Sequence, residues 1–270
     1  MRRAWPAGPT SMTTQNHYTF GDSERAGRRL ELLARVYEPP SRALLERFKP
    51  SALALALDLG CGPGHTTRLV HAVSQAQRTL GLEASERYLA QARATAPPGV
   101  EFQREDVTAP SGQVPAADLV FCRFLLTHVA SPRAAISGFR AFMKPDATLL
   151  LQETAHLASS HPALARYYEL VGELQAHYGQ TLYIGQELER LARGAPFRVV
   201  HAGVRRLEHP AATMAELHLQ NLRTWRTDAF AQSAFDAAEL NELERRLQAL
   251  VGGEEHAPPV DIGLGELVLR

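Results

Sequence analysis

The chain contains little cysteine, no excess charge and no long apolar segment, and each absence excludes a class of protein. Only two cysteines, Cys61 and Cys122, occur in 270 residues, too few for a disulfide framework, so we expect reduced thiols. No apolar run approaches the ~18 residues that a membrane-spanning helix needs, and we expect no membrane insertion. The 29 basic and 29 acidic side chains cancel, which removes the main electrostatic reason to bind nucleic acid.

Motifs for hydrolysis and for metal binding are also missing. No Gly-x-Ser-x-Gly sequence is present to form a nucleophile elbow. His156 and His161 lack a carboxylate at ligand spacing, and no paired-cysteine motif occurs, so no metal site is expected. Residues 1–11 lack the apolar segment of a secretory signal. We expect residues 1–16 to be a disordered leader, Met12 to be an alternative start, and the protein to be cytoplasmic.

The most informative stretch is residues 53–73. Residues 53–59 are almost entirely apolar and are bounded by turn residues, which predicts a fully buried parallel strand. Residues 66–73 are predicted to form a helix, and the turn between them contains Gly60, Gly62 and Gly64. This arrangement brings backbone N–H groups and a positive helix end to a nucleotide-like ligand. Glycine permits the close approach and the positive φ. A tight turn that binds nothing is the alternative.

The glycine spacing indicates which nucleotide is bound. The dinucleotide fingerprint is Gly-x-Gly-x-x-Gly, whereas this chain has Gly-x-Gly-x-Gly, with Asp58 two residues before the first glycine. No Lys-Ser or Lys-Thr follows, so a phosphate-binding loop is not expected. The segment resembles motif I of the class I S-adenosylmethionine-dependent methyltransferases. The specific motifs of this resemblance lie within residues 51–154.

The resemblance implies S-adenosylmethionine as the cofactor, S-adenosylhomocysteine as its product, and a set of binding positions. Glu83 would accept hydrogen bonds from the ribose hydroxyls. Asp106, or Glu105 in its place, would accept one from the adenine amino group while the Val107 backbone N–H reaches the ring. Tyr18 lies in a segment similar to one that precedes the first helix of many bacterial small-molecule methyltransferases; a core aromatic is the alternative. The expected cofactor-binding residues are Asp58, Gly60, Cys61, Gly62, Gly64, Glu83, Ala84, Asp106, Val107, Arg123 and Tyr18.

The remaining pattern alternates strands with helices. Further strands are expected over residues 78–83, 100–104, 117–122 and 147–151, with helices between them. This alternation predicts an α/β fold with a doubly wound, mostly parallel sheet, and the resemblance implies seven strands with the last one antiparallel. The site should lie at the carboxyl ends of the first and fourth strands, where the strand order reverses. Cys61, Arg123 and Glu153 should converge there.

Helical segments precede and interrupt this core, which we place at residues 51–155. Residues 17–50 should form an arm of two helices separated by Pro39-Pro40. Residues 156–195 should form a cap over the substrate, with Tyr168, His177, Tyr178 and Tyr183 as its contributors. Residues 196–270 should supply strands at 197–207 and 260–269, with a helical insertion at about 211–256 between them. Two capping boxes should open its helices, Thr213-x-x-Glu216 and Asp236-x-x-Glu239.

Methyl transfer from a sulfonium requires the protein chiefly to position the acceptor and exclude water. A hydroxyl or acidic-carbon acceptor would also need a general base. Glu153 and His128 are the candidate catalytic residues, and Glu153 is favoured because a strand end is fixed by the sheet. A buried structural role is the alternative for His128, and an amine acceptor would need neither residue. No Asn-Pro-Pro-Tyr-like motif follows the fourth strand, which favours a small-molecule acceptor for O-, N- or C-methylation.

Two other functions are compatible with the sequence. One is a non-enzymatic protein that binds S-adenosylmethionine or regulates others and keeps the fold, since fold does not determine function. The other is an NAD(P)-dependent oxidoreductase, which fits the glycine spacing and the N-terminal helices less well. The sequence indicates neither the acceptor, nor the methylated atom, nor the oligomeric state.

Overall fold

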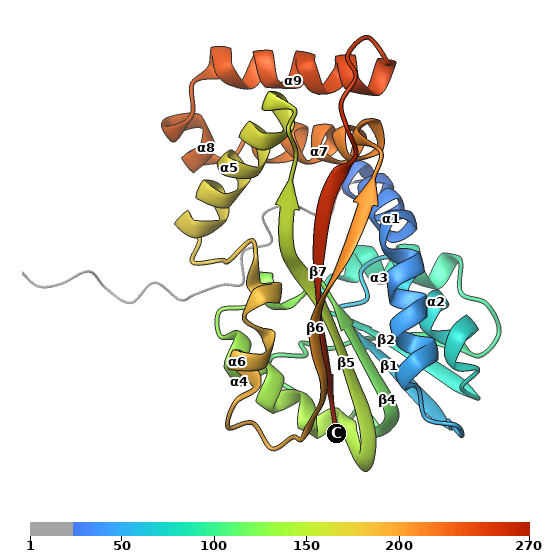
Figure 1. Ribbon diagram of the computed structural model, residues 1–270. Helices are drawn as coiled ribbons and strands as arrows, with labels where there is room; N and C mark the ends of the chain where they lie inside the picture. The colour runs from blue at the N-terminus through green and yellow to red at the C-terminus, as the bar shows by residue number, and fades with distance from the viewer. Residues whose placement is uncertain (1–23) are drawn as a thin grey trace, which may run out of the picture.

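A seven-stranded sheet forms the centre of residues 24–270, the part of the chain that the computed structural model describes (Figure 1). The strand order is β3-β2-β1-β4-β5-β7-β6. The strands are β1 (Leu55–Leu59), β2 (Arg78–Glu83), β3 (Val100–Arg104), β4 (Ala117–Arg123), β5 (Met143–Ala158), β6 (Val199–His209) and β7 (Val260–Leu269). All neighbours run parallel except β7, which is antiparallel to both β5 and β6. The predicted fold class, with an antiparallel last strand, is confirmed.

Helices cover both faces of the sheet, which explains why β1 is buried along its whole length and is apolar except for Asp58. On one face, Leu57 and Leu59 pack with residues of α4 (Pro132–Gly138), of the turn η2 (Phe139–Phe142) and of α6 (Leu188–Ala192). On the other face, Ala56 packs under α1 (Glu24–Phe48) and α2 (His65–Ser74). Helix α3 (Glu86–Ala94) packs against Phe102 of β3.

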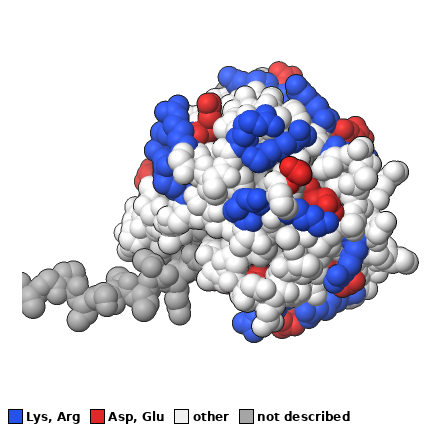
Figure 2. Space-filling view, turned by 90° about the horizontal axis from the view of Figure 1, so that it is seen from below, with Lys and Arg blue, Asp and Glu red and all other residues white. Residues whose placement is uncertain are grey.

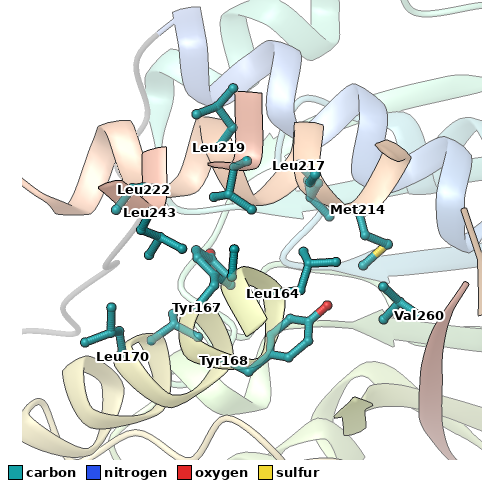
Figure 3. Close-up of a cluster of buried hydrophobic side chains, with 14 of the residues drawn as sticks. Leu164, Tyr167, Tyr168, Leu170, Met214, Leu217, Leu219, Leu222, Leu243 and Val260 are labelled. Carbon is teal, nitrogen blue, oxygen red and sulfur yellow. The ribbon is translucent and has the colours of Figure 1, made fainter. Parts of the chain in front are cut away.

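Four more helices gather beyond the ends of β5, β6 and β7, at the top of Figure 1. They are α5 (Pro162–His177), α7 (Ala211–Trp225), α8 (Ala229–Ala234) and α9 (Ala237–Gly252). Figure 3 shows how α5 and α7 meet: Leu164 and Tyr167 of α5 lie near Met214 and Leu217 of α7 in one buried cluster. Helices α5 and α7 are called the roof below.

Strand β5 is much longer than predicted. The sequence suggested residues 147–151, whereas the strand continues to Ala158, so Glu153 lies inside it and the cap begins only at Pro162. The reason is non-local, because β7 pairs with β5 from Leu149 through Ala158. Antiparallel partners thus extend β5 beyond the parallel part of the sheet.

The prediction of two helices in the arm is wrong, since α1 runs unbroken through Pro39 and Pro40. Proline lacks an N–H, so Pro40 cannot donate to the carbonyl of Val36 four residues earlier. His209, at the end of β6, replaces that donor, with its Nε2 3.0 Å from the Val36 oxygen. A tertiary hydrogen bond therefore compensates for the local break.

The two predicted capping boxes had different outcomes. Asp236 does cap α9, because its carboxylate accepts a hydrogen bond from the Ala238 N–H at 3.0 Å. The Thr213 box is wrong: α7 already starts at Ala211, directly after Pro210, and no side chain caps it. Pro210 fixes φ at the helix entry, so α7 can begin there without a capping side chain.

The surface offers no field of one sign on the face drawn in Figure 2, where basic and acidic side chains are interspersed. Within residues 24–270, no helix combines the length and the apolarity needed to cross a membrane. The same residues contain no group of three or more His, Cys, Asp or Glu side chains placed to hold a metal ion.

Candidate active site

A cavity of about 480 Å³ opens at the carboxyl ends of the parallel strands and extends beneath the roof. Its floor consists of the glycine turn after β1 and the segments that follow β2, β3 and β4. Helix α1 forms one side, and α5 and α7 cover the top. The volume lies within the range of pockets that enclose small ligands and cofactors.

The glycines of the turn have two different tasks. Gly62 lies on the cavity with φ +52°, and a Cβ there would have Leu30 Cδ1 at 3.8 Å as its nearest neighbour, so it would project into the open space. Gly64 does not line the cavity; a Cβ there would come within 2.6 Å of Phe102 Cζ. Gly62 therefore makes room for a ligand, whereas Gly64 lets the turn pack on β3.

Asp58 supports the turn from below and does not reach the cavity. Its Oδ2 accepts a hydrogen bond from Thr67 Oγ1 at 2.7 Å, which joins β1 to α2. Burial raises the pKa of Asp58 to about 7, an effect that the Thr67 hydroxyl and the Arg123 guanidinium partly offset. Asp58 was expected to bind the cofactor, but in this structure it can affect a ligand only through the turn that it supports.

Glu83 lies on the cavity and connects two backbone segments. Its Oε2 accepts a hydrogen bond from the Gly62 N–H at 2.9 Å, and its Oε1 accepts one from the Ser85 N–H at 2.8 Å. An ionised carboxylate can accept further hydrogen bonds at each oxygen, so both oxygens stay able to receive ribose hydroxyls. Ala84 lines the cavity beside it.

The two acids after β3 differ in what they already bind. Glu105 is buried, and its two oxygens accept hydrogen bonds from the N–H and the hydroxyl of Ser111. Asp106 is exposed at the cavity, and one oxygen, Oδ1, accepts from Thr108. Asp106 is therefore the better placed acceptor for an adenine amino group. Val107 lines the cavity next to it.

Arg123 reaches the cavity but mainly binds other parts of the chain. From the end of β4, its Nη1 donates to the Tyr37 carbonyl and, at 2.8 Å, to Ser41 Oγ, while Nη2 donates to Thr66 Oγ1 at 3.0 Å. Burial lowers the pKa of the guanidinium to about 10, still well above neutral. Arg123 thus fixes α1 and α2 to β4. Cys61 also lines the cavity, and burial raises the pKa of its thiol.

Both candidate bases lie on the cavity wall. Glu153 Oε1 accepts hydrogen bonds from the backbone N–H groups of Leu125 and Leu126 at 2.8 and 2.6 Å, and burial raises its pKa to about 8. His128 is in the turn η1 (Leu126–His128), where burial, and after it the charge of Arg29, lowers its pKa to about 3. The structure therefore brings both side chains together with Cys61 and Arg123, as the strand order predicts.

Phe124 is a wall residue that no sequence motif singled out. Its φ of +55° is unusual for a residue with a side chain and stores strain of the order of 1 kcal/mol. The conformation is held by a hydrogen bond from its N–H to the Gln152 carbonyl at 3.0 Å and by an edge contact with the Tyr37 ring, 4.8 Å between centroids. Because strained backbone conformations cluster at functional sites, we count Phe124 among the residues of the candidate site.

The aromatic residues that the cap was expected to contribute lie in the cap but point away from the cavity. None of the four lines the cavity. Tyr168 contacts His218, the His177 ring stacks on Phe230, and the hydroxyls of Tyr178 and Tyr183 donate to Asp228 and to the Leu157 carbonyl. They were chosen by residue type, whereas the helical face decides which side chains reach the cavity.

The residues that do reach the cavity from above come from two helices. Tyr167, Val171 and Gln175 line it from α5, and Met214, Leu217, His218 and Asn221 line it from α7. The spacing of four residues in α5 is the signal that could have found them. Arg29 adds a buried charge from α1. The expected contact of Tyr18, and the leader at 1–16, lie outside the described residues.

Comparison with known proteins agrees with this geometry. Residues 30–202 match a family described as methyltransferase domain. The trans-aconitate 2-methyltransferase of Methylobacterium nodulans is 39% identical over 126 residues, which cover 43% of this chain and 47% of that protein. The enzyme of the same name from Paracidovorax citrulli is 29% identical over 186 residues, which cover 66% of this chain and 70% of that protein. The chain thus spans about half the length of several of the curated relatives it matches.

A solved structure supports the fold. It is the crystal structure of a Bacillus halodurans protein that carries a provisional methyltransferase name. This structure aligns with the chain with a TM-score of 0.56 at 15% sequence identity. The alignment covers 85% of this chain and 97% of that one. At this identity, the likeness concerns the arrangement of helices and strands only.

Proposed function

Because this chain belongs to the methyltransferase-domain family, whose methyl donor is S-adenosylmethionine, we propose that it methylates a small-molecule acceptor bound under the roof. One observation carries the proposal: a single cavity joins the glycine turn, Glu83 and Asp106 on its floor to the underside of α5 and α7, where apolar and polar side chains alternate. Donor and acceptor can therefore be held in one space, as an in-line displacement requires.

The residues on the floor fit the cofactor. S-adenosylmethionine supplies an electrophilic methyl group on a sulfonium centre. Gly62 has no side chain and therefore leaves room for this cofactor, because a Cβ there would stand in the cavity. Glu83 would accept the ribose hydroxyls, and Asp106, helped by the Val107 N–H, would bind the adenine ring.

Helix α1 and the roof would orient the acceptor and exclude water. The hydrophobic cluster that joins α5, α7 and α9 keeps the roof in place over the floor. Arg123 keeps α1 seated, through Tyr37 and Ser41. Since the donor is already activated, this positioning would supply most of the rate.

Glu153 is our proposed general base for a hydroxyl acceptor, with His128 as the second candidate. A base works best when its pKa lies near the working pH, and that of Glu153 is about 8 whereas that of His128 is about 3. Glu153 is also held in place by two backbone donors, Leu125 and Leu126. An acceptor that is already ionised, such as a carboxylate, would need neither residue.

Trans-aconitate is the first named compound to test, because the names of several relatives state it as their substrate. Calorimetric titration with S-adenosylhomocysteine and, separately, NAD would test the cofactor, and transfer of a labelled methyl group to trans-aconitate, phenols, amines and monocarboxylates would test the reaction. We expect S-adenosylhomocysteine to bind and NAD not to bind. Binding of NAD alone would indicate an oxidoreductase, and binding of S-adenosylhomocysteine without transfer to any acceptor would indicate a binding protein.

A further inference from the structure

We propose that Glu266, a buried acid that does not line the cavity, is a positioning residue for the reaction. It acts through Gln152 and Ser41, which orient the Arg123 guanidinium and thereby set helix α1 against the cavity. The proposal rests on the function proposed above, because it concerns how the same site keeps its shape. The polar network is defined as Ser41, Arg123, Gln152, Arg205 and Glu266. Of these five residues, only Arg123 lines the cavity.

Pairing between the strands places three members of the polar network in one row across the sheet. Arg123 of β4 is in register with Gln152 of β5, and Gln152 is in register with Glu266 of β7. Residues in register on neighbouring strands point to the same face of a sheet. This is the face that α1 covers, because Ser41 of α1 is hydrogen-bonded to two of the three side chains.

The charge of Glu266 is compensated within the polar network. Its partner in register on β6 is Gly203, which has no side chain, so Arg205 reaches Glu266 from two positions further along. Arg205 donates from Nε to Oε1 at 2.7 Å and from Nη2 to Oε2 at 3.2 Å. Gln152 Nε2 donates to the same Oε1 at 3.1 Å. Glu266 is only 4% exposed, and a carboxylate buried to this degree needs such partners.

The hydrogen bonds of the polar network run in one direction, from Arg123 toward Glu266. An ionised carboxylate can only accept, so Gln152 must turn its amide nitrogen toward Glu266 and its amide oxygen away. That oxygen accepts a hydrogen bond from Ser41 Oγ at 2.6 Å. Ser41 thereby uses its only proton, and its oxygen accepts from Arg123 Nη1 at 2.8 Å. The charge of Glu266 therefore determines which groups Arg123 meets.

The side chains around the polar network are apolar, so packing alone does not require it. Leu44 of α1, Leu150 of β5 and Val268 of β7 belong to one buried cluster. Ser41 and Gln152 are completely buried between α1 and the sheet. Replacing a buried polar network by apolar side chains of similar volume is often neutral or stabilising. A fully satisfied network instead specifies one arrangement of the elements that it joins.

The polar network is connected to residues that shape the cavity wall. Arg123 also donates to the Tyr37 carbonyl on α1 and to Thr66 Oγ1 on α2. The backbone carbonyl of Gln152 accepts a hydrogen bond from the N–H of Phe124, whose φ is positive. Tyr37, Thr66 and Phe124 all line the cavity. A network that loses its direction should therefore change the affinity for a ligand even while the fold persists.

The test compares substitutions at two positions of the polar network by calorimetric titration with S-adenosylhomocysteine. Ser41→Ala removes the link to Arg123. Glu266→Gln keeps the size, but Arg205 should take the one amide oxygen, since a charge-assisted hydrogen bond is stronger, and the NH₂ group then faces Gln152. Each variant should bind about threefold or more weakly than the natural protein. The double variant should bind no more weakly than the worse single variant, because both substitutions interrupt the same chain.

The matched controls are Ser74→Ala, a buried serine of α2 outside the polar network, and Glu208→Gln, an exposed acid on β6. Both should leave the affinity unchanged. Lower melting temperatures with unchanged affinity in Ser41→Ala and Glu266→Gln would overturn the proposal, as would losses that multiply in the double variant. If Glu266→Gln does not fold, Gln152→Met, similar in length but without hydrogen-bonding groups, replaces it. Failure of the natural protein to bind S-adenosylhomocysteine would instead refute the proposed function.

Discussion

The Glu83 carboxylate is hydrogen-bonded to the backbone N–H of Gly62, 2.9 Å away and 21 positions earlier in the chain. The same carboxylate holds the Ser85 N–H at the start of α3. The acid expected to bind the ribose therefore also fixes the turn beneath the cofactor. Any ligand contact of Glu83 is consequently coupled to the shape of that turn.

Two substitutions of Glu83 should weaken cofactor binding to different degrees. Glu83→Ala removes both acceptors and should reduce the free energy of S-adenosylhomocysteine binding by about 1–3 kcal/mol. Glu83→Gln should lose less, because its amide oxygen can still accept one backbone hydrogen bond. Calorimetry measures both. The control is Glu101→Gln on neighbouring β3, whose exposed side chain pairs with Arg78; the idea fails if all three variants bind equally.

Gly62→Val should abolish binding of S-adenosylhomocysteine while the protein stays folded. The added side chain would project into the cavity, whereas the strain of its positive φ should cost only about 1–2 kcal/mol of stability. Gly112→Val is the matched control, since Gly112 also has a positive φ (+77°), has nothing within 4 Å of a Cβ and does not line the cavity. Its melting temperature should fall similarly, with unchanged affinity. Unchanged affinity in Gly62→Val would contradict the cofactor site.

The two halves of this chain differ in how far sequence reasoning could reach. The glycine turn and the ends of β1 to β4 were predictable, because their signals are local: an apolar run, a turn composition and an acid at a strand end. The length of β5 was not, because it depends on pairing with β7 more than a hundred residues later. The continuity of α1 likewise depends on His209.

The roof escaped prediction for another reason. In α5, Tyr167 and Tyr168 are adjacent, and the four-residue spacing of Tyr167, Val171 and Gln175 groups these side chains on one face without saying that this face meets the cavity while Tyr168 binds His218. The contribution of α7 was missed because the insertion at 211–256 was not expected near the substrate. The burial of Arg29 on α1 was likewise not predictable from the sequence, because it depends on the packing of α7 against α1.

Glu153 should make the protein less stable as the pH rises. Its pKa is raised from 4.5 to about 8 in the folded state, so between these values the folded protein binds a proton that the unfolded chain has lost. Stability therefore falls as the pH rises through this window. Glu153→Gln cannot ionise, so it should melt like the natural protein near pH 5 and at a higher temperature near pH 9. Glu208→Gln, an exposed control on β6, should follow the natural protein; parallel curves for all three would refute the assignment.

On a hydroxyl acceptor, Glu153→Gln should lower turnover by about 10²–10⁴-fold and leave the affinity for S-adenosylhomocysteine unchanged. The amide oxygen can still accept from Leu125 and Leu126, so the wall keeps its shape. His128→Ala should have the smaller effect, because a buried imidazole with a pKa of about 3 is a weak base. Full activity of both variants would mean that the acceptor arrives already ionised or is an amine.

The roof should become protected when the site is filled. Hydrogen exchange followed by mass spectrometry should slow in α5 and α7 when cofactor product and acceptor are both present, because the roof side chains then contact a ligand. Helix α9 packs behind α7 and lines no part of the cavity, so its exchange should change less. Equal exchange with and without ligands would mean that the roof is only a structural appendage.

The position of Arg123 has a consequence for mapping this site by alanine scanning. One guanidinium joins α1, α2 and β4, so Arg123→Ala would score as a binding residue even if it never touched a ligand. The loss would be transmitted through displaced neighbours, and so it would not add to the loss at Ser41. A double-mutant cycle between Arg123 and Ser41 would expose this epistasis. A simple ranking of single substitutions would instead classify Arg123, a residue that holds helices in place, as a residue that binds the ligand.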